Sequence, residues 1–256
     1  MTSDKTKQKY IDKLGPDFGE MLHDVEEEWS YVLLRYQEFM DLFGKGEKRV
    51  AFLNALSPAF ALDLQVELSN ALILGLCRLT DKDIRNQSVS VCHLPGFIRD
   101  NTVLKAEVSC HVARAQTYAE AARVRRNKWI AHRDKVRPDP AVTYEDIKAG
   151  LDAVYAALNA MAMGYWKHFI ANEVISRQMP TVRFVACLES LVEGVIYIES
   201  RIDPKGESEP FDDEVSRAFL RRIGGDPSAD LVILQRLRMA AKTIKEGLDL
   251  DVSQLD

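Results

Sequence analysis

A short cationic segment, RRNKWIAHRDK at residues 125–135, holds the side chains best suited to chemistry. It gathers five Lys or Arg residues, one histidine and one acid, although the whole chain carries a net charge of −5. Histidine has an unperturbed pKa of about 6.5, so it can take or give a proton near neutral pH. Arginine offers a forked, permanently charged donor that matches phosphate oxygens. Arg126 and His132 together predict acid–base chemistry at a phosphate group.

The basic side chains are concentrated in one part of the chain. Residues 111–137 hold eight Lys or Arg against two acids, a net of +6, so the rest of the chain, within a total of −5, carries −11. Net acidity argues against a protein that coats nucleic acid through a broad basic face. A compact positive site on an acidic body suits a single phosphate better than a long polyanion.

Arg126 also falls where a helical pattern expects an apolar residue. Small and apolar residues spaced by three and four predict a helix that begins after a cap at Asn101 or Thr102: Val108, Val112, Ala115, Ala119 and Ala122. The next positions of this stripe are Arg126, Trp129 and Arg133. A guanidinium there either reaches into solvent as the stripe emerges from the core, or faces a cleft or subunit interface where a phosphate binds.

Other helices must position this segment. Apolar spacing and capping residues predict helices over about 17–43, from Glu47, from Ser57-Pro58 to about Leu79, and after a capping box that begins at Thr143. Residues 80–96 are predicted to be a loop. Long amphipathic helices joined by short breaks indicate an all-α, antiparallel helical bundle over 1–168, followed by a mostly helical C-terminal extension over 169–256.

Other kinds of chemistry have little support in the sequence. The phosphate-binding patterns G-x-x-x-x-G-K-[ST] and G-x-G-x-x-G and the nucleophile pattern G-x-S-x-G do not occur. The pairs Cys92-His93 and Cys110-His111 do not have zinc-site spacing, so we expect no metal and no cofactor. The first residues lack the apolar core of a signal peptide and the apolar runs carry charges, so we expect a cytoplasmic protein with no membrane association.

The cationic segment resembles a known family signature. Arg126-Asn127-Lys128-Trp129-Ile130-Ala131-His132 is similar to the R-N-x(4)-H form of the R-x(4–6)-H signature of HEPN domains. These are all-α ribonucleases and RNA-binding modules of bacterial defence, toxin–antitoxin and abortive-infection systems. RNKWIAHRDK, LCRLTD at 76–81 and an N-x-S-x-x-x-x-L-like stretch from Asn86 to Leu94 resemble the AbiU-type abortive-infection branch. The resemblance covers about residues 17–165.

Two positions depart from the family pattern. Arg125 also fits the spacing to the histidine, and Arg126 is preferred as the motif arginine because the polar Asn127 follows it. Asp134 stands where some HEPN toxins carry a tyrosine that a partner nucleotidyltransferase modifies. That form of control is therefore not expected here.

The resemblance implies a metal-independent endoribonuclease that uses the RNA 2′-hydroxyl as nucleophile and leaves a 2′,3′-cyclic phosphate. Arg126 and His132 would be catalytic, supported by Asn127, Lys128, Arg125, Asp134 and Asp81. The partners implied are RNA, with tRNA as a candidate substrate, a second copy of the chain in a homodimer, and an antitoxin protein. The alternative is a non-catalytic HEPN dimer that binds RNA, a nucleotide or a protein partner.

Overall fold

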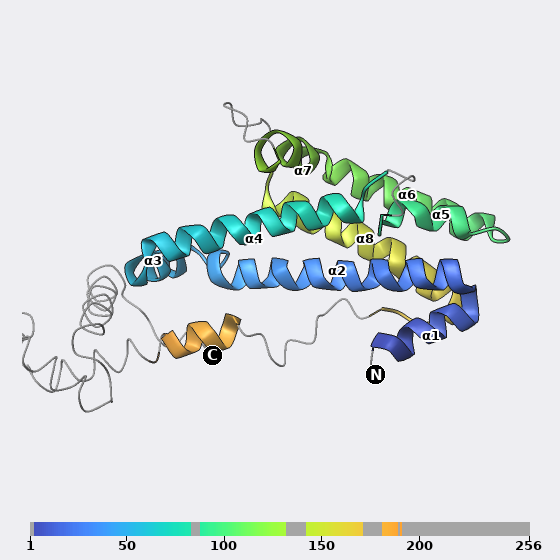
Figure 1. Ribbon diagram of the computed structural model, residues 1–256, viewed down its shortest axis with the longest axis horizontal. Coiled ribbons are helices and arrows are strands. Elements are labelled where there is room, and N and C mark those ends of the chain that lie inside the picture. The colour runs from blue at the N-terminus through green and yellow to red at the C-terminus, as the bar shows by residue number, and fades with distance from the viewer. Residues whose placement is uncertain (1–2, 83–87, 132–141, 171–180, 189, 191–256) are drawn as a thin grey trace, which may run out of the picture. The chain divides into compact units, whose positions relative to one another are not determined.

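A computed structural model (Figure 1) describes residues 3–82, 88–131, 142–170, 181–188 and 190. All regular secondary structure within these ranges is helical, which confirms the predicted all-α class. The chain forms two compact units, one of residues 1–37 with 67–176 and the other of residues 38–66 with 177–256. The boundary between 168 and 169 stays a prediction. His132, Asp134 and most of the predicted C-terminal extension lie outside the described residues.

Four long helices are the main elements: α2 (Pro16–Phe43), α4 (Pro58–Leu79), α6 (Thr102–Tyr118) and α8 (Tyr144–Trp166). The shorter elements are α1 (Ser3–Leu14), α3 (Glu47–Leu56), η2 (Val91–His93), α5 (Leu94–Phe97), α7 (Glu120–Arg125) and the π-helical turn η3 (Arg126–Ile130). The helix starts predicted at Glu47 and at Pro58 are both confirmed.

Local capping explains where two of these helices begin. The Asn101 side chain accepts a hydrogen bond from the Leu104 N–H at 3.0 Å, which caps α6. The Thr143 hydroxyl oxygen accepts from the Asp146 N–H at 3.0 Å, which starts α8 at the predicted capping box. Each cap satisfies a backbone donor that has no partner within its own helix.

Contacts within the first unit show how its long helices run. The Trp29 indole N–H of α2 donates to the Leu151 carbonyl of α8 at 3.1 Å, and both groups are buried. The absence of a side chain at Gly150 lets α8 approach Leu76 of α4, and Gly164 approaches Leu104 of α6 in the same way. The four helices run in alternating directions along the chain (Figure 1), as in an up-down-up-down bundle.

The loop predicted over 80–96 is only partly correct. Residues 91–97 form the 3₁₀ turn η2 and the single-turn helix α5. The Ser90 hydroxyl accepts from the Cys92 N–H at 3.2 Å, and Leu94 is fully buried. A cap and a buried anchor therefore order this stretch although it is too short to show a helical period.

Helix α4 is also the one described helix that is long and apolar enough to cross a bilayer by length and composition. Of its most apolar window, 39% is buried inside the protein. Core helices of soluble proteins pass the same test, so this property alone does not indicate a membrane span.

Candidate functional site

The candidate site begins where α6 ends. The five stripe residues Val108, Val112, Ala115, Ala119 and Ala122 are all buried, as predicted. The helix is interrupted at Ala119, however, and continues as α7 and then η3. The Ala131 N–H donates to the Arg126 carbonyl at 2.9 Å, which closes the turn five residues apart instead of four. The α-helical spacing of the stripe holds up to Arg126, whose backbone N–H donates to the Ala122 carbonyl. Beyond Arg126 the π turn inserts one extra residue, so the predicted α-helical spacing does not continue to Trp129.

The π turn carries the motif arginine and its neighbours. The Nε of Arg126 donates to the Asn127 side-chain oxygen at 2.9 Å, so the two predicted site residues contact each other. Arg126 is half-buried, while Asn127 and Lys128 are exposed. Turns of this kind are frequent at functional sites, because they change the direction of side chains within an otherwise regular helix.

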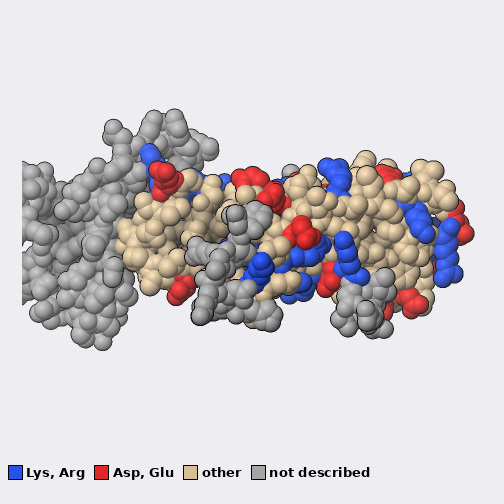
Figure 2. Space-filling model, turned by 90° about the horizontal axis from the view of Figure 1, so that it is seen from above, with Lys and Arg blue, Asp and Glu red and all other residues tan. Residues whose placement is uncertain are grey.

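Most Lys and Arg side chains of α7 and η3 have no ion pair with a described acidic residue. The ion pair on α7 joins Arg123 to Glu120 at 3.0 Å. Among the described residues, no carboxylate lies at ion-pair distance from Arg125, Arg126 or Lys128. Figure 2 looks onto this side of the molecule and shows Lys and Arg side chains gathered over α7, with a few acidic side chains among them. The described part of the site therefore presents cationic groups available to an anion.

Arg123 is the residue of this segment that sequence reasoning missed. Its guanidinium donates to both the carbonyl and the hydroxyl oxygen of Thr80, at 2.9 and 3.0 Å. It also donates to the Gln116 carbonyl at 3.0 Å. Thr80 is the fifth residue of the LCRLTD stretch, and Arg123 lies three residues before the Arg126–His132 motif, so this bond connects the LCRLTD stretch to the helix that leads into the motif. The only signal for Arg123 in the sequence was its place among the eight basic residues of 111–137.

Charged groups also act on the thiol of Cys77, which lies in the last turn of α4. Burial raises the pKa of this thiol, the guanidinium groups of Arg126 and Arg123 act to lower it, and Asp81 and Glu120 act to raise it. All four charged side chains therefore lie close enough to Cys77 to influence the pKa of its thiol. Asp81 is half-buried there, and its carbonyl accepts from the Ser90 hydroxyl at 2.8 Å. That its carboxylate holds an arginine stays a prediction.

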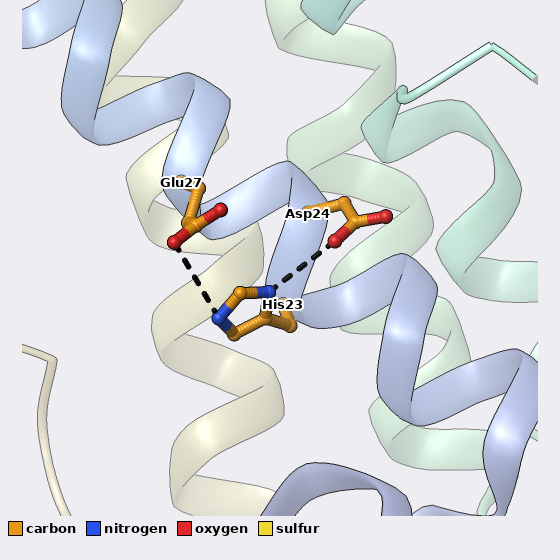
Figure 3. Close-up of side chains that lie close together, drawn as sticks. All are labelled: His23, Asp24 and Glu27. Atoms are coloured by element: carbon orange, nitrogen blue, oxygen red, sulfur yellow. Dashed lines mark hydrogen bonds and ion pairs between the residues drawn. The ribbon is translucent and has the colours of Figure 1, made fainter. Parts of the chain in front are cut away.

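A second titratable cluster lies on α2 and contains His23, Asp24 and Glu27. Figure 3 shows the two carboxylates at opposite nitrogens of the ring. Asp24 lies 3.2 Å from Nδ1, and Glu27 lies 3.6 Å from Nε2. A neutral imidazole has one ring nitrogen with a free lone pair. While Asp24 stays at Nδ1, a metal ion could therefore take at most two ligands here, Nε2 of His23 and the Glu27 carboxylate. Zinc sites in proteins use three or four protein ligands, so this cluster is better described as a buried histidine that lies between two carboxylates.

A cavity of about 590 Å³ lies between α6 and α8, in another part of the first unit. Leu104, Tyr155 and Met163 line it, together with His111, whose Nδ1 is buried without a hydrogen-bond partner among the described residues. None of the predicted site residues lines this cavity. The cationic segment on α7 and η3 is therefore separate from it.

Comparison with known proteins identifies the family of this chain. Residues 15–177 match the sequence model of the AbiU2 family of HEPN proteins, which is more than half of the chain. The chain belongs to the HEPN AbiU2 family. No curated protein and no solved structure matches it. The matched residues of this AbiU2 protein include α2, α4, α6, α7, η3 and α8, and therefore both the LCRLTD stretch and the whole Arg126–His132 motif.

Proposed function

We propose that this AbiU2 protein is a metal-independent endoribonuclease of a bacterial abortive-infection or toxin–antitoxin system and that it acts in the cytoplasm. The observation that carries the proposal is the pairing of Arg126 with Asn127 on a π turn, six residues before a histidine and within a HEPN family match. The guanidinium is held by a neutral amide and has no acidic partner among the described residues. It can therefore bind a phosphate without first breaking an ion pair.

The proposed chemistry uses the RNA itself as the source of the nucleophile. The 2′-hydroxyl attacks the adjacent phosphorus and loses its proton to a base, while the 5′-oxygen leaves and takes a proton from an acid. His132 would serve one of these proton steps, and Arg126 would neutralise the charge that develops on the phosphorane oxygens. The products are a 2′,3′-cyclic phosphate and a 5′-hydroxyl. No step of this reaction needs a metal-bound water.

One chain supplies one such histidine, whereas the reaction has two proton steps. A symmetric homodimer brings the same patch of each subunit together. Two copies of Arg126 and His132 in one cleft would then provide both the base and the acid. Lys128, Arg125 and Asn127 would bind flanking phosphates, with Asp81 and Asp134 as supporting residues. RNA, with tRNA as a candidate substrate, is the proposed partner, and an antitoxin protein would restrain the activity.

The test is cleavage of a mixed-sequence RNA and of a tRNA pool by the purified full chain in EDTA, with analysis of the product ends. His132→Ala and Arg126→Gln should each lower the cleavage rate by about 100-fold or more, the usual effect of losing a general acid–base or a charge-stabilising group. The matched controls are His168→Ala and Arg99→Gln, because both residues are exposed and lie outside the motif.

Three results would each contradict a part of this proposal: the activity, its site or its independence of metal. Intact RNA at high protein concentration, with the homodimer confirmed by light scattering, would favour the non-catalytic binding dimer. In that case RNA binding should depend on Arg126 and tolerate His132→Ala. Cleavage that survives in His132→Ala would point to another site or to a contaminant. Cleavage that requires added Mg²⁺ would exclude the metal-independent mechanism.

A further inference from the structure

We propose that Arg123 is a positioning residue, which anchors the Arg126–Lys128 turn to the end of α4, and that it is not a phosphate ligand. This inference rests on the proposed function of the same site. It assigns different roles to neighbouring arginines that have the same charge and lie on the same short segment.

The contacts of Arg123 use both ends of its guanidinium fork. One terminal nitrogen donates to the Thr80 carbonyl at 2.9 Å and to the Thr80 hydroxyl oxygen at 3.0 Å. The other donates to the Gln116 carbonyl and to the Glu120 carboxylate, both at 3.0 Å. The Arg123 side chain is 17% exposed, whereas that of Glu120 is 71% exposed. The Thr80 and Gln116 bonds therefore contribute more than the surface ion pair, which water screens.

The acceptor side of this anchor is itself fixed. Thr80 is fully buried, and its hydroxyl donates to the Leu76 carbonyl at 2.8 Å. Gln116 lies in the last turn of α6 and Thr80 directly follows α4, so carbonyl groups from two helix C-termini converge on one cation. Cations are favoured at helix C-termini, where the backbone carbonyls lack partners. Arg123 therefore joins the ends of α4 and α6 to α7.

Few side chains of the segment that runs from α7 to η3 are fully buried. Ala122 is the one buried residue of α7, and η3 has none. A helix of six residues is not stable by itself in water, and beyond Ala122 the apolar side chains of this segment, Val124, Trp129 and Ile130, are only half-buried. The bonds of Arg123 supply the fixed point from which the π turn projects Arg126, Asn127 and Lys128. Both terminal nitrogens of Arg123 already donate within the protein, so Arg123 is a poor candidate for binding phosphate.

The experiment combines hydrogen exchange with RNA cleavage in the full chain and compares Arg123→Gln, Arg123→Lys and Thr80→Val with the wild type. Arg99→Gln is the charge-matched control, because Arg99 is exposed and outside the site. Loss of a buried, charge-assisted bond should speed amide exchange over residues 120–131 by about tenfold or more while α8 stays protected. The kcat for cleavage should fall by about tenfold with KM nearly unchanged, because the cations remain but are misplaced.

Lysine keeps the charge but cannot reach the Thr80 and Gln116 acceptors together, so Arg123→Lys should behave like Arg123→Gln. Full activity in Arg123→Lys, or a raised KM with unchanged kcat in Arg123→Gln, would overturn the anchor and make Arg123 a direct RNA contact. If α8 also loses protection in the arginine variants, the change has disturbed more than the segment 120–131. Thr80→Val then becomes the variant that tests the anchor, because it removes one of the bonds that Arg123 makes. If the wild type cuts no RNA, the proposed function fails, and the exchange measurement still tests the anchor.

Discussion

The close approach of α2 and α4 gives a prediction with a definite sign. Gly75 of α4 faces the side chain of Val32 on α2. A Cβ at this position would lie 2.5 Å from Val32 Cγ2 and 3.0 Å from Cγ1, well inside the 3.4 Å at which ordinary contact begins. We expect Gly75→Ala to destabilise the protein, although alanine is the better helix former. The effect matters for the site because Thr80 directly follows α4.

The magnitude follows from two opposing terms. Replacing glycine by alanine within a helix gains about 1 kcal/mol of helix propensity. Overpacking a well-filled core costs about 1–3 kcal/mol, and this position should lie near the upper end. Val32 is fully buried and β-branched, so it cannot rotate away within its helix. The net loss should be about 1–2 kcal/mol, or roughly 2–8 °C in Tm for a domain of this size.

The assay is urea unfolding of the full chain followed by far-ultraviolet circular dichroism, with Val32→Ala as the partner variant. If the clash is the cause, the double variant should be more stable than the sum of the two single effects by about 1–2 kcal/mol. Gly150→Ala is the comparison, because there the nearest atom, at 2.9 Å, is a methyl group of the more flexible Leu76. A Gly75→Ala protein that is more stable than the wild type by about 1 kcal/mol, the gain in helix propensity, would show that there is no clash with Val32 and would refute the reasoning.

Two further predictions concern titratable groups. Burial and a hydrogen bond to Glu26 raise the pKa of Tyr10, so its contribution to stability is complete below the unfolded value of about 10 and is lost as the pH rises further. Urea unfolding midpoints between pH 9 and 11.5 should therefore fall less steeply in Tyr10→Phe than in the wild type. Burial raises the pKa of the Cys77 thiol, whereas Cys110 and Cys187 are exposed. Iodoacetamide at neutral pH, followed by peptide mass spectrometry, should label the two exposed thiols at least about tenfold faster, and equal rates would contradict the described packing.

Sequence patterns were sufficient for the features that depend on neighbouring residues. The capping box at Thr143, the start of α4 at Pro58 and the buried stripe from Val108 to Ala122 were all predicted correctly. Each depends on side chains within about one or two turns, where helical geometry makes spacing informative. The resemblance of the Arg126–His132 motif to HEPN proteins was also visible from the sequence, and the AbiU2 family match confirms it.

Features that depend on distant contacts were not predictable in this way. Helix α1 precedes the first predicted helix, and its Tyr10 hydroxyl donates to Glu26 at 2.6 Å. The π turn at Arg126 interrupts a pattern that predicted an unbroken helix. The bond between Arg123 and Thr80 spans 43 residues, so no periodicity along the chain could indicate it. The sequence by itself indicated the residues of the candidate site around Arg126 and the family to which the chain belongs. Only tertiary packing decided which of the arginines is anchored and which remain available to a phosphate, because residues of the same type differ only in the groups that the fold brings to them.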